Sequence, residues 1–305
     1  MKRSERKVLI ADSALFMVAL FWGYGFIAMK DGLASFPILW LTALRFSSAF
    51  VLMMAFFWKK ILKVRLRELK AGLVIGTLLF LGFVAQTLAL NYTTVGKVAF
   101  LTTVYVILIP FLSWIFFKRT PGLSVFFASL LCLTGMGLLS LDSGLSLGMG
   151  EILTLACAVC FALHLLTIEH SMRDMDAVVI AAVQIAVVAI YSGAGALFFE
   201  TWPTQITSSS IWSIAFSSIF CTVLAFLIQT NAQKFTPATH TAILLSLESV
   251  FGAIFGMILL GDPLTMRIAA GFSLILGAVL MTELAPFMKR IPLRSREGSS
   301  ATVLK

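Results

Sequence analysis

The chain has 305 residues, of which 60% are hydrophobic and 12% are charged, and its formal net charge is +9. A soluble domain of this composition would leave much apolar surface in water, so the composition excludes an ordinary soluble protein. The positive charge gathers in particular connections, and no basic motif interleaved with aromatic residues occurs, so no nucleic-acid partner is expected. The sequence therefore predicts a polytopic protein whose surroundings are the lipid bilayer.

The apolar runs have about the twenty residues of a bilayer-spanning helix. The alternating segments of about ten residues that an outer-membrane barrel needs are absent. Turn signals such as Thr120-Pro121-Gly122 and Trp202-Pro203 separate the runs. We predict an all-α membrane protein with ten transmembrane helices near residues 11–29, 36–58, 70–91, 95–117, 122–141, 148–169, 177–199, 211–233, 237–260 and 267–286.

The distribution of the 23 Lys and Arg residues predicts the orientation of these helices. Three of them, Lys30, Lys97 and Arg267, fall on the side opposite the N-terminus, and Arg45 lies within a predicted helix. All the others fall on the side of the N-terminus. By the positive-inside rule we expect a multi-pass protein of the cell (inner) membrane with both termini in the cytoplasm, and hence an even number of spans.

The two halves of the chain show weak internal similarity. A shift of 143 residues, or of 139 near the start of each half, brings related positions together: Gln86 with Gln229, Tyr105 with Glu248, and Arg45 with Gln184. Because a unit of five helices crosses the membrane an odd number of times, a second copy of the unit enters the membrane from the opposite side. We therefore expect two inverted five-helix repeats, an arrangement in which transporters bind substrate at the repeat interface near mid-membrane.

Several segments resemble the EamA-like branch of the drug/metabolite transporter superfamily. The first half carries Phe21-Trp22-Gly23, then Ala43-Leu44-Arg45-Phe46, and the stretch Ala99 to Pro110. The second half carries Ala232-Gln233-Lys234-Phe235-Thr236-Pro237, Ser246-Leu247-Glu248-Ser249-Val250-Phe251 and Leu260-Gly261-Asp262. The order and spacing of these motifs carry the resemblance, which covers residues 12 to 286.

The resemblance implies a first repeat at residues 11–141 and a second at 148–286, between cytoplasmic tails at 1–10 and 287–305. It also implies a secondary transporter that exports small metabolites, amino acids first, by alternating access around a central cavity. Ser249 and Asp262 stand where the family usually has Pro and Glu. The sequence therefore no longer implies the helix kink near Glu248.

Three side chains near mid-membrane are the first candidates for a substrate site: Arg45, Tyr105 and Glu248. An ionisable group is costly in hydrocarbon, so it faces the bundle interior or water and usually has a function. We expect Arg45 to hold a substrate carboxylate and Glu248 to bind its ammonium group or a coupling proton. The alternative is a structural ion pair that fixes the second helix against the ninth.

Four further polar or aromatic residues are candidates for the same site: Trp22, Gln86, Gln229 and His164. Each has a structural alternative. Trp22 could anchor the helix at the membrane interface, and the two glutamines could form hydrogen bonds between helices. His164 shares a helix face with Cys157 and Cys160, but no fourth ligand follows, so we expect no metal and a packing or cavity-lining histidine instead.

No catalytic or nucleotide-binding motif occurs in the sequence, so we expect neither an enzyme nor a cofactor. The expected partners are a small-molecule substrate and the lipid bilayer. Gly72/Gly76 and Gly252/Gly256 have the spacing of close helix contacts, between the repeats or in a homodimer. An obligate metabolite exchanger is the alternative within transport, and a lipid-handling or regulatory membrane protein is the alternative outside it.

Overall fold

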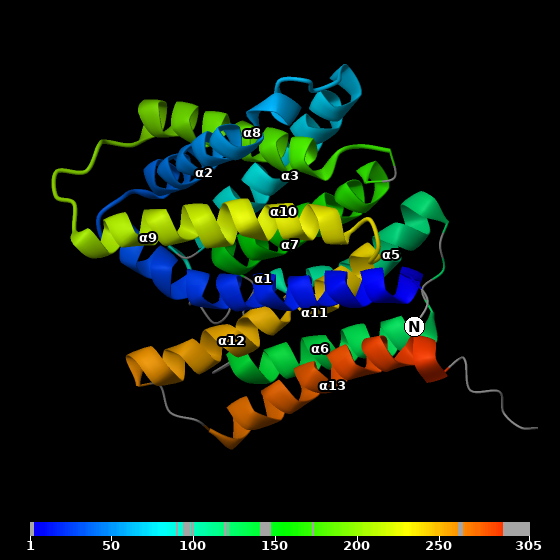
Figure 1. Ribbon diagram of the computed structural model, residues 1–305. Helices are drawn as coiled ribbons and strands as arrows, with labels where there is room; N and C mark the ends of the chain where they lie inside the picture. Colours follow the sequence, from blue (N-terminus) through cyan, green and yellow to red (C-terminus); the bar gives the residue numbers. More distant parts are fainter. Residues whose placement is uncertain are drawn as a thin grey trace, which may run out of the picture.

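The computed structural model describes residues 3–89, 91–93, 98, 101–118, 120, 122–140, 148–172, 174–261 and 265–288. Throughout these residues the regular secondary structure is helical (Figure 1). Seven helices in the described part of the chain are long and apolar enough to cross a membrane, and shorter apolar helices accompany them. The prediction of an all-α membrane protein is thereby confirmed, whereas the number ten stays a prediction.

The described helices follow the predicted runs in order. The first half contains α1 (Arg3–Leu33), α2 (Ile38–Ile61), α3 (Leu66–Ala89), α5 (Tyr105–Phe117) and α6 (Leu123–Ser140). The second half contains α7 (Met149–Ser171), α8 (Ala177–Phe199), α9 (Ser208–Ser218), the π-helix η1 (Ile219–Leu224), α10 (Ala225–Ala232), α11 (Ala238–Leu245), α12 (Leu247–Phe255), the π-helix η2 (Gly256–Leu260) and α13 (Met266–Met288).

Helix α1 begins at Arg3, whereas the apolar run predicted a helix from residue 11. Hydropathy marks where a helix enters the hydrocarbon, but it does not mark where the helix begins. Residues 3 to 10 contain neither Gly nor Pro, so the helical backbone continues beyond the apolar run at little cost. Of the predicted segment 1–10, most is therefore helical.

One end of the bundle carries most of the described basic residues, and we call it the basic end. The start of α1 lies there with the α10–α11 turn, since Lys7 stands over the Phe235 ring at 5.4 Å. The α2–α3 turn also lies there, because Arg67 pairs with Asp174 of the α7–α8 turn at 3.5 Å. The predicted separation of charge is therefore seen among the described residues, with the N-terminus and the basic end on the right in Figure 1.

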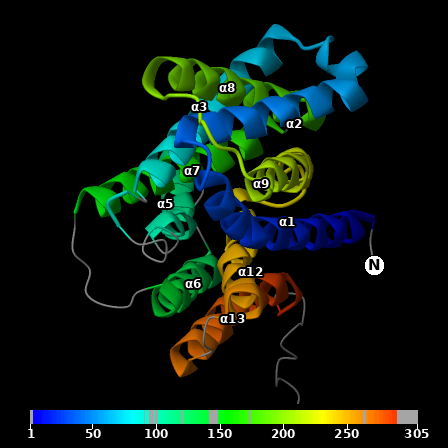
Figure 2. The same ribbon diagram turned by 90° about the vertical axis from the view of Figure 1, so that its left-hand side faces the viewer.

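The helices form layers that both views show. Helices α2, α3 and α8 lie on one side, α6, α12 and α13 lie on the other, and α1 and α9 run between them (Figures 1 and 2). The contacts repeat when the two halves are exchanged. α2 packs against α8, and α6 packs against α13. The contact of α1 with α9 and α10 in one direction corresponds to the contact of α7 with α3 in the other. This exchange is what two related five-helix units produce.

Two glycines allow the halves to approach closely within one chain. A Cβ atom on Gly72 would come within 2.5 Å of the Val183 side chain, and one on Gly76 within 2.7 Å of Val187. Both contacts join α3 to α8. Of the two readings of the Gly72/Gly76 spacing, the structure therefore shows packing between the two halves.

Three of the predicted continuous helices contain an interruption or a change of helix type. The run predicted at 237–260 is divided at Ser246 into α11 and α12, and the run predicted at 211–233 contains η1. The run predicted at 95–117 has a turn at Thr103 and Val104 before α5 begins. Apolar periodicity did not predict these changes because none of the three positions carries Pro or Gly.

Candidate functional site

A cavity lies among the helices of both halves. The side chains around it come from α1, α2, α3, α5, α7, η1, α10, α11 and α12. All seven residues that the sequence proposed for a substrate site line this cavity: Trp22, Arg45, Gln86, Tyr105, His164, Gln229 and Glu248. The structure thus brings together groups that lie up to 226 residues apart in the chain.

Arg45 is held firmly at the cavity wall. Its Nε donates to the hydroxyl of Thr222 at 2.7 Å, and its Nη2 donates to the carbonyl oxygen of Cys221 at 3.1 Å. The guanidinium carbon lies 5.2 Å from the centre of the Phe46 ring and 5.3 Å from that of Phe83. These contacts orient the group and leave its remaining N–H donors for other partners, because a guanidinium has five.

The π-helix η1 explains why a main-chain carbonyl is open to Arg45. In an α-helix the N–H of Ala225 would bond to Cys221, four residues earlier. Here it bonds to Phe220, five residues earlier. The carbonyl oxygen of Cys221 instead accepts from Arg45 and from the indole Nε1 of Trp22, at 3.1 and 3.0 Å. The wide turn thereby ties α1 and α2 to the same residue of η1.

Trp22 lines the cavity, with its ring edge-on to Phe226 at 5.9 Å. The neighbouring Gly23 explains the Trp-Gly pair in physical terms. A Cβ atom on Gly23 would come within 2.5 Å of the Phe251 Cβ atom and 2.9 Å of the carbonyl oxygen of Glu248. Only glycine lets α1 approach α12 so closely, and this contact brings Trp22 and Glu248 to one cavity.

Glu248 contributes the carboxylate that lines the cavity. Among the residues that the structure describes, it takes part in no ion pair and no hydrogen bond, and its side chain is partly open to the cavity. In particular, it does not pair with Arg45, so the structural ion pair considered from the sequence is not formed here. A carboxylate in an apolar bundle without a partner is available to a ligand or a proton.

The remaining predicted residues are mostly engaged with neighbouring helices. His164 is 3% exposed and its Nε2 lies 2.9 Å from Oε1 of Gln184, whose Nε2 donates to Thr230 at 3.4 Å. The amide of Gln86 donates to Thr102 at 3.2 Å. Gln229 is 1% exposed, and no described residue donates a hydrogen bond to its Oε1.

Tyr105 is buried at the first position of α5 and also lines the cavity. The shift of 143 residues that relates the two halves of the sequence pairs Tyr105 with Glu248. Cys157, Cys160 and His164 do not make a metal site: the described residues include no group of three or more His, Cys, Asp or Glu side chains that could hold a metal ion.

The aromatic walls of the cavity were not predicted. Phe26, Phe83, Phe161 and Phe226 supply much of the lining, together with Met29. The chain contains 27 phenylalanines, most of which serve packing or contact lipid, so sequence alone offers no signal that selects these four. Their flat apolar faces suit the apolar part of an organic substrate.

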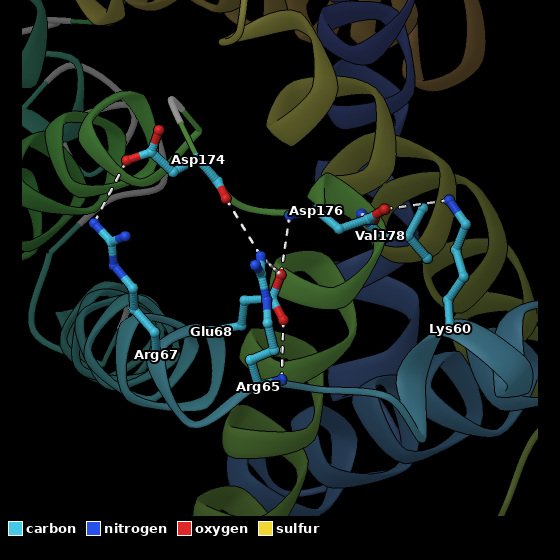
Figure 3. A network of polar contacts seen from close by, with 7 residues as sticks. All are labelled: Lys60, Arg65, Arg67, Glu68, Asp174, Asp176 and Val178. Atoms are coloured by element: carbon cyan, nitrogen blue, oxygen red, sulfur yellow. Dashed lines mark hydrogen bonds and ion pairs between the residues drawn. The ribbon is translucent and has the colours of Figure 1, made fainter.

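At the basic end, a polar network joins the two halves outside the cavity (Figure 3). Glu68, whose side chain is 4% exposed, pairs with Arg65 at 2.7 Å and accepts from the main-chain N–H of Asp176 at 3.2 Å. Asp176 caps α8 by accepting from the N–H of Val178 at 2.8 Å and pairs with Lys60 at 3.3 Å. The α2–α3 turn is thereby fastened to the start of α8.

The sequence of the chain matches the EamA-like transporter family twice, at residues 9–141 and 148–284. The chain belongs to this family. An uncharacterized transporter of Archaeoglobus fulgidus is 32% identical over 280 residues, which is 91% of this chain and 87% of that one. The uncharacterized transporter YoaV of Bacillus subtilis is 24% identical over 87% of this chain and 93% of its own.

The resemblance inferred from the motifs is therefore confirmed, and this EamA-like protein is a membrane transporter. A crystal structure with 18% sequence identity superposes with a TM-score of 0.79, covering 92% of this chain and 98% of the other. At that identity the likeness shows the fold alone. It supports the arrangement of the helices around the cavity. The substrate has to be inferred from the chemistry of the residues that line the cavity.

Proposed function

We propose that this EamA-like transporter is a secondary exporter of small metabolites, amino acids first, that works by alternating access. In this proposal ten helices in two inverted repeats span the cell (inner) membrane, with both termini and the basic end in the cytoplasm. The exchange symmetry of the helix contacts supports two related repeats. The collection of described basic residues at one end supports the orientation.

The observation that carries the proposal is one cavity that holds a partnerless carboxylate and an oriented guanidinium. Glu248 and Arg45 both line it and are not paired with each other. A zwitterion supplies what both groups lack: its ammonium group neutralises Glu248, and its carboxylate accepts from the remaining N–H groups of Arg45. Trp22, Tyr105, Gln86, Gln229 and His164 complete the proposed site.

Glu248 is also the proposed coupling group. A carboxylate that binds a proton in one state and a substrate ammonium group in another links the two fluxes through mutual exclusion. The sequence carries no nucleotide-binding motif, so the proposed energy source is the proton gradient or a counter-substrate. No cofactor is needed for either route.

The test is uptake of a labelled amino-acid mixture into sealed proteoliposomes, with and without an imposed pH gradient. We expect uptake that grows with the gradient, and we expect Glu248→Gln to remove that growth while the protein remains in the membrane. Gradient-driven uptake that is unchanged in Glu248→Gln contradicts the coupling role. Uptake that appears only after vesicles are loaded with a counter-substrate identifies an obligate exchanger, and no movement of any labelled compound under either condition contradicts amino-acid transport.

A further inference from the structure

Glu248 lies immediately after the interruption that separates α11 from α12. α11 ends at Leu245, Ser246 forms a turn, and α12 begins at Leu247. Glu248 is thus the second residue of a new helix rather than the middle of a long one. The N-terminal end of a helix carries partial positive charge, which stabilises a carboxylate in its first turn. The position of the interruption therefore decides both the surroundings and the direction of this side chain.

Two serine hydroxyls hold the interruption. Ser246 donates from Oγ to the carbonyl oxygen of Ile243 at 2.6 Å, and Ser249 donates from Oγ to that of Ser246 at 2.6 Å. The N–H of Ser249 also bonds to Ser246, three residues back, at 3.3 Å. Serine hydroxyls that bond to carbonyls of the preceding turn compete with the main-chain ladder and bend helices.

A neighbouring helix fixes one of these hydroxyls. The thiol of Cys132 on α6 donates to Oγ of Ser246 at 3.0 Å. Ser246 is 0% exposed, so its hydroxyl has no access to water and depends on these partners. The turn is therefore anchored to the rest of the bundle and not only to its own helix.

The first half has an interruption at the corresponding place, also without proline. Val104 bonds to Leu101 and Val106 bonds to Thr103, both three residues back, at 3.2 and 2.9 Å. α5 then begins at Tyr105. Thr103 and Ser246 are related by the same shift of 143 residues that relates Tyr105 to Glu248. An interruption that recurs just before a cavity-lining residue in each half indicates a function in aiming that residue.

We infer that Ser246 and Ser249 are positioning residues: their hydroxyls break the helix without proline and aim Glu248 into the cavity. This inference rests on the transport function proposed above for the same cavity. Ser249 is the third residue of α12. Proline at this position would remove only the 3.3 Å bond from the N–H of Ser249 to Ser246, because a first-turn N–H has no partner four residues back within its own helix. Proline is therefore compatible with the observed interruption.

The test compares Ser246→Ala/Ser249→Ala with Ser246→Ala/Ser249→Pro. The first removes both hydroxyls and permits a continuous helix, whereas the second restores an interruption by other means. The first readout is the rate at which a hydrophobic carbodiimide modifies Glu248, identified by mass spectrometry, with Glu248→Gln as the blank. This readout needs no transported substrate, so it separates failure of the positioning inference from failure of the proposed function.

We expect the double alanine variant to react about tenfold more slowly and to lose about tenfold in uptake at low substrate concentration, because displacements of about 1 Å suffice for such losses. The proline variant is expected to return both quantities to near wild type. Ser273→Ala is the matched control, since Ser273 donates to Ala269 at 3.0 Å on an exposed face of α13. It should change neither readout.

Wild-type modification rates in the double alanine variant would overturn the inference, whether or not uptake is observed. If the double alanine variant does not fold, the modification rate of the proline variant tests the inference. Folded protein that reacts at the wild-type rate supports the positioning role, and folded protein that reacts about tenfold more slowly contradicts it.

Discussion

The carboxylates at the ends of the helices and the carboxylate inside the bundle are used differently. Glu200 accepts from the N–H groups of Leu39 and Trp40, both at 2.9 Å, and so caps α2 from the α8 side. Glu68 accepts from the N–H of Asp176, the residue that precedes α8 at the basic end. Glu248 has no such partner among the described residues. The difference indicates that the end carboxylates stabilise the fold, and it agrees with the ligand-binding role proposed for Glu248.

The largest difference between a carboxylate that serves transport and one that serves stability is expected when Glu248 is neutralised. We expect Glu248→Gln to lower gradient-driven uptake by about a hundredfold, since a residue of this kind in a membrane protein is functional by default. Its free energy of unfolding should remain unchanged or rise, because the substitution removes an unpaired charge from an apolar bundle. Uptake into sealed proteoliposomes and thermal unfolding in detergent, from the same purified protein, provide the two measurements. A marked loss of stability in Glu248→Gln would show that Glu248 stabilises the fold, as the carboxylates at the helix ends do.

Removing Glu68 should have the opposite result. Glu68→Ala leaves Arg65 and the N–H of Asp176 without their acceptor. We expect the free energy of unfolding to fall by about 1–3 kcal/mol, the usual cost of unpartnered buried groups. The KM for substrate should not change, because the residue lies outside the cavity. Arg67→Ala, which removes an exposed pair, is the control with little expected effect.

Glu200→Gln tests the cap at the opposite end. Glutamine can still accept one hydrogen bond but loses the negative charge at the start of α2. We expect a loss of about 1 kcal/mol, as for other substituted caps. The change should appear in the unfolding temperature, with uptake per folded molecule unaltered. A larger effect on uptake than on stability would indicate that this end moves during transport.

The smallest effect is expected from the exposed pair of Lys60 and Asp176. Burial alone would raise the pKa of Asp176, but hydrogen bonds from the N–H groups of Val178 and Val179 and the contact with Lys60 together lower that pKa below its ordinary value of 3.8. The stabilisation is therefore present above about pH 4 and is lost as the pH falls through the lowered pKa.

Lys60→Ala should cost at most about 0.5 kcal/mol at neutral pH, because exposed pairs are well screened. The measurement is the unfolding temperature as a function of pH for the wild type and this variant. The two curves should converge at the acidic end, where Asp176 is protonated in both proteins. A gap that persists there would mean that Lys60 acts through other contacts.

Much of the fold could be predicted from the chain because the bilayer imposes a simple rule on hydropathy. Apolar runs separated by Pro, Gly and charged residues marked the described helices in order. The cavity residues were also found, since a polar side chain such as Arg45, Gln86 or Glu248 in an apolar run is itself the signal. A weak repeat then indicated that such residues converge.

The partners of these residues could not be predicted. Arg45 is held by the carbonyl oxygen of Cys221, and a carbonyl is present at every residue, so no letter of the sequence marks it. The interruption at Ser246 depends on serine hydroxyl groups. Serine is an ordinary small residue at other positions of the chain, so its presence alone does not predict an interruption. No Pro or Gly in the sequence marks η1. A π-helix differs from an α-helix in its hydrogen-bond register and does not require a different composition.

The π-helix η1 has a consequence for how this protein tolerates changes in chain length. A π-turn holds one residue more than the α-helix that would replace it, while the flanking segments keep their facing. α9 directs Ser213 toward α1, and α10 directs Gln229 toward the cavity. Deleting one residue elsewhere in this span would rotate one flank away from its neighbours. Within 219–224 a single deletion would leave both flanks in place and remove only the open carbonyl that Arg45 and Trp22 share.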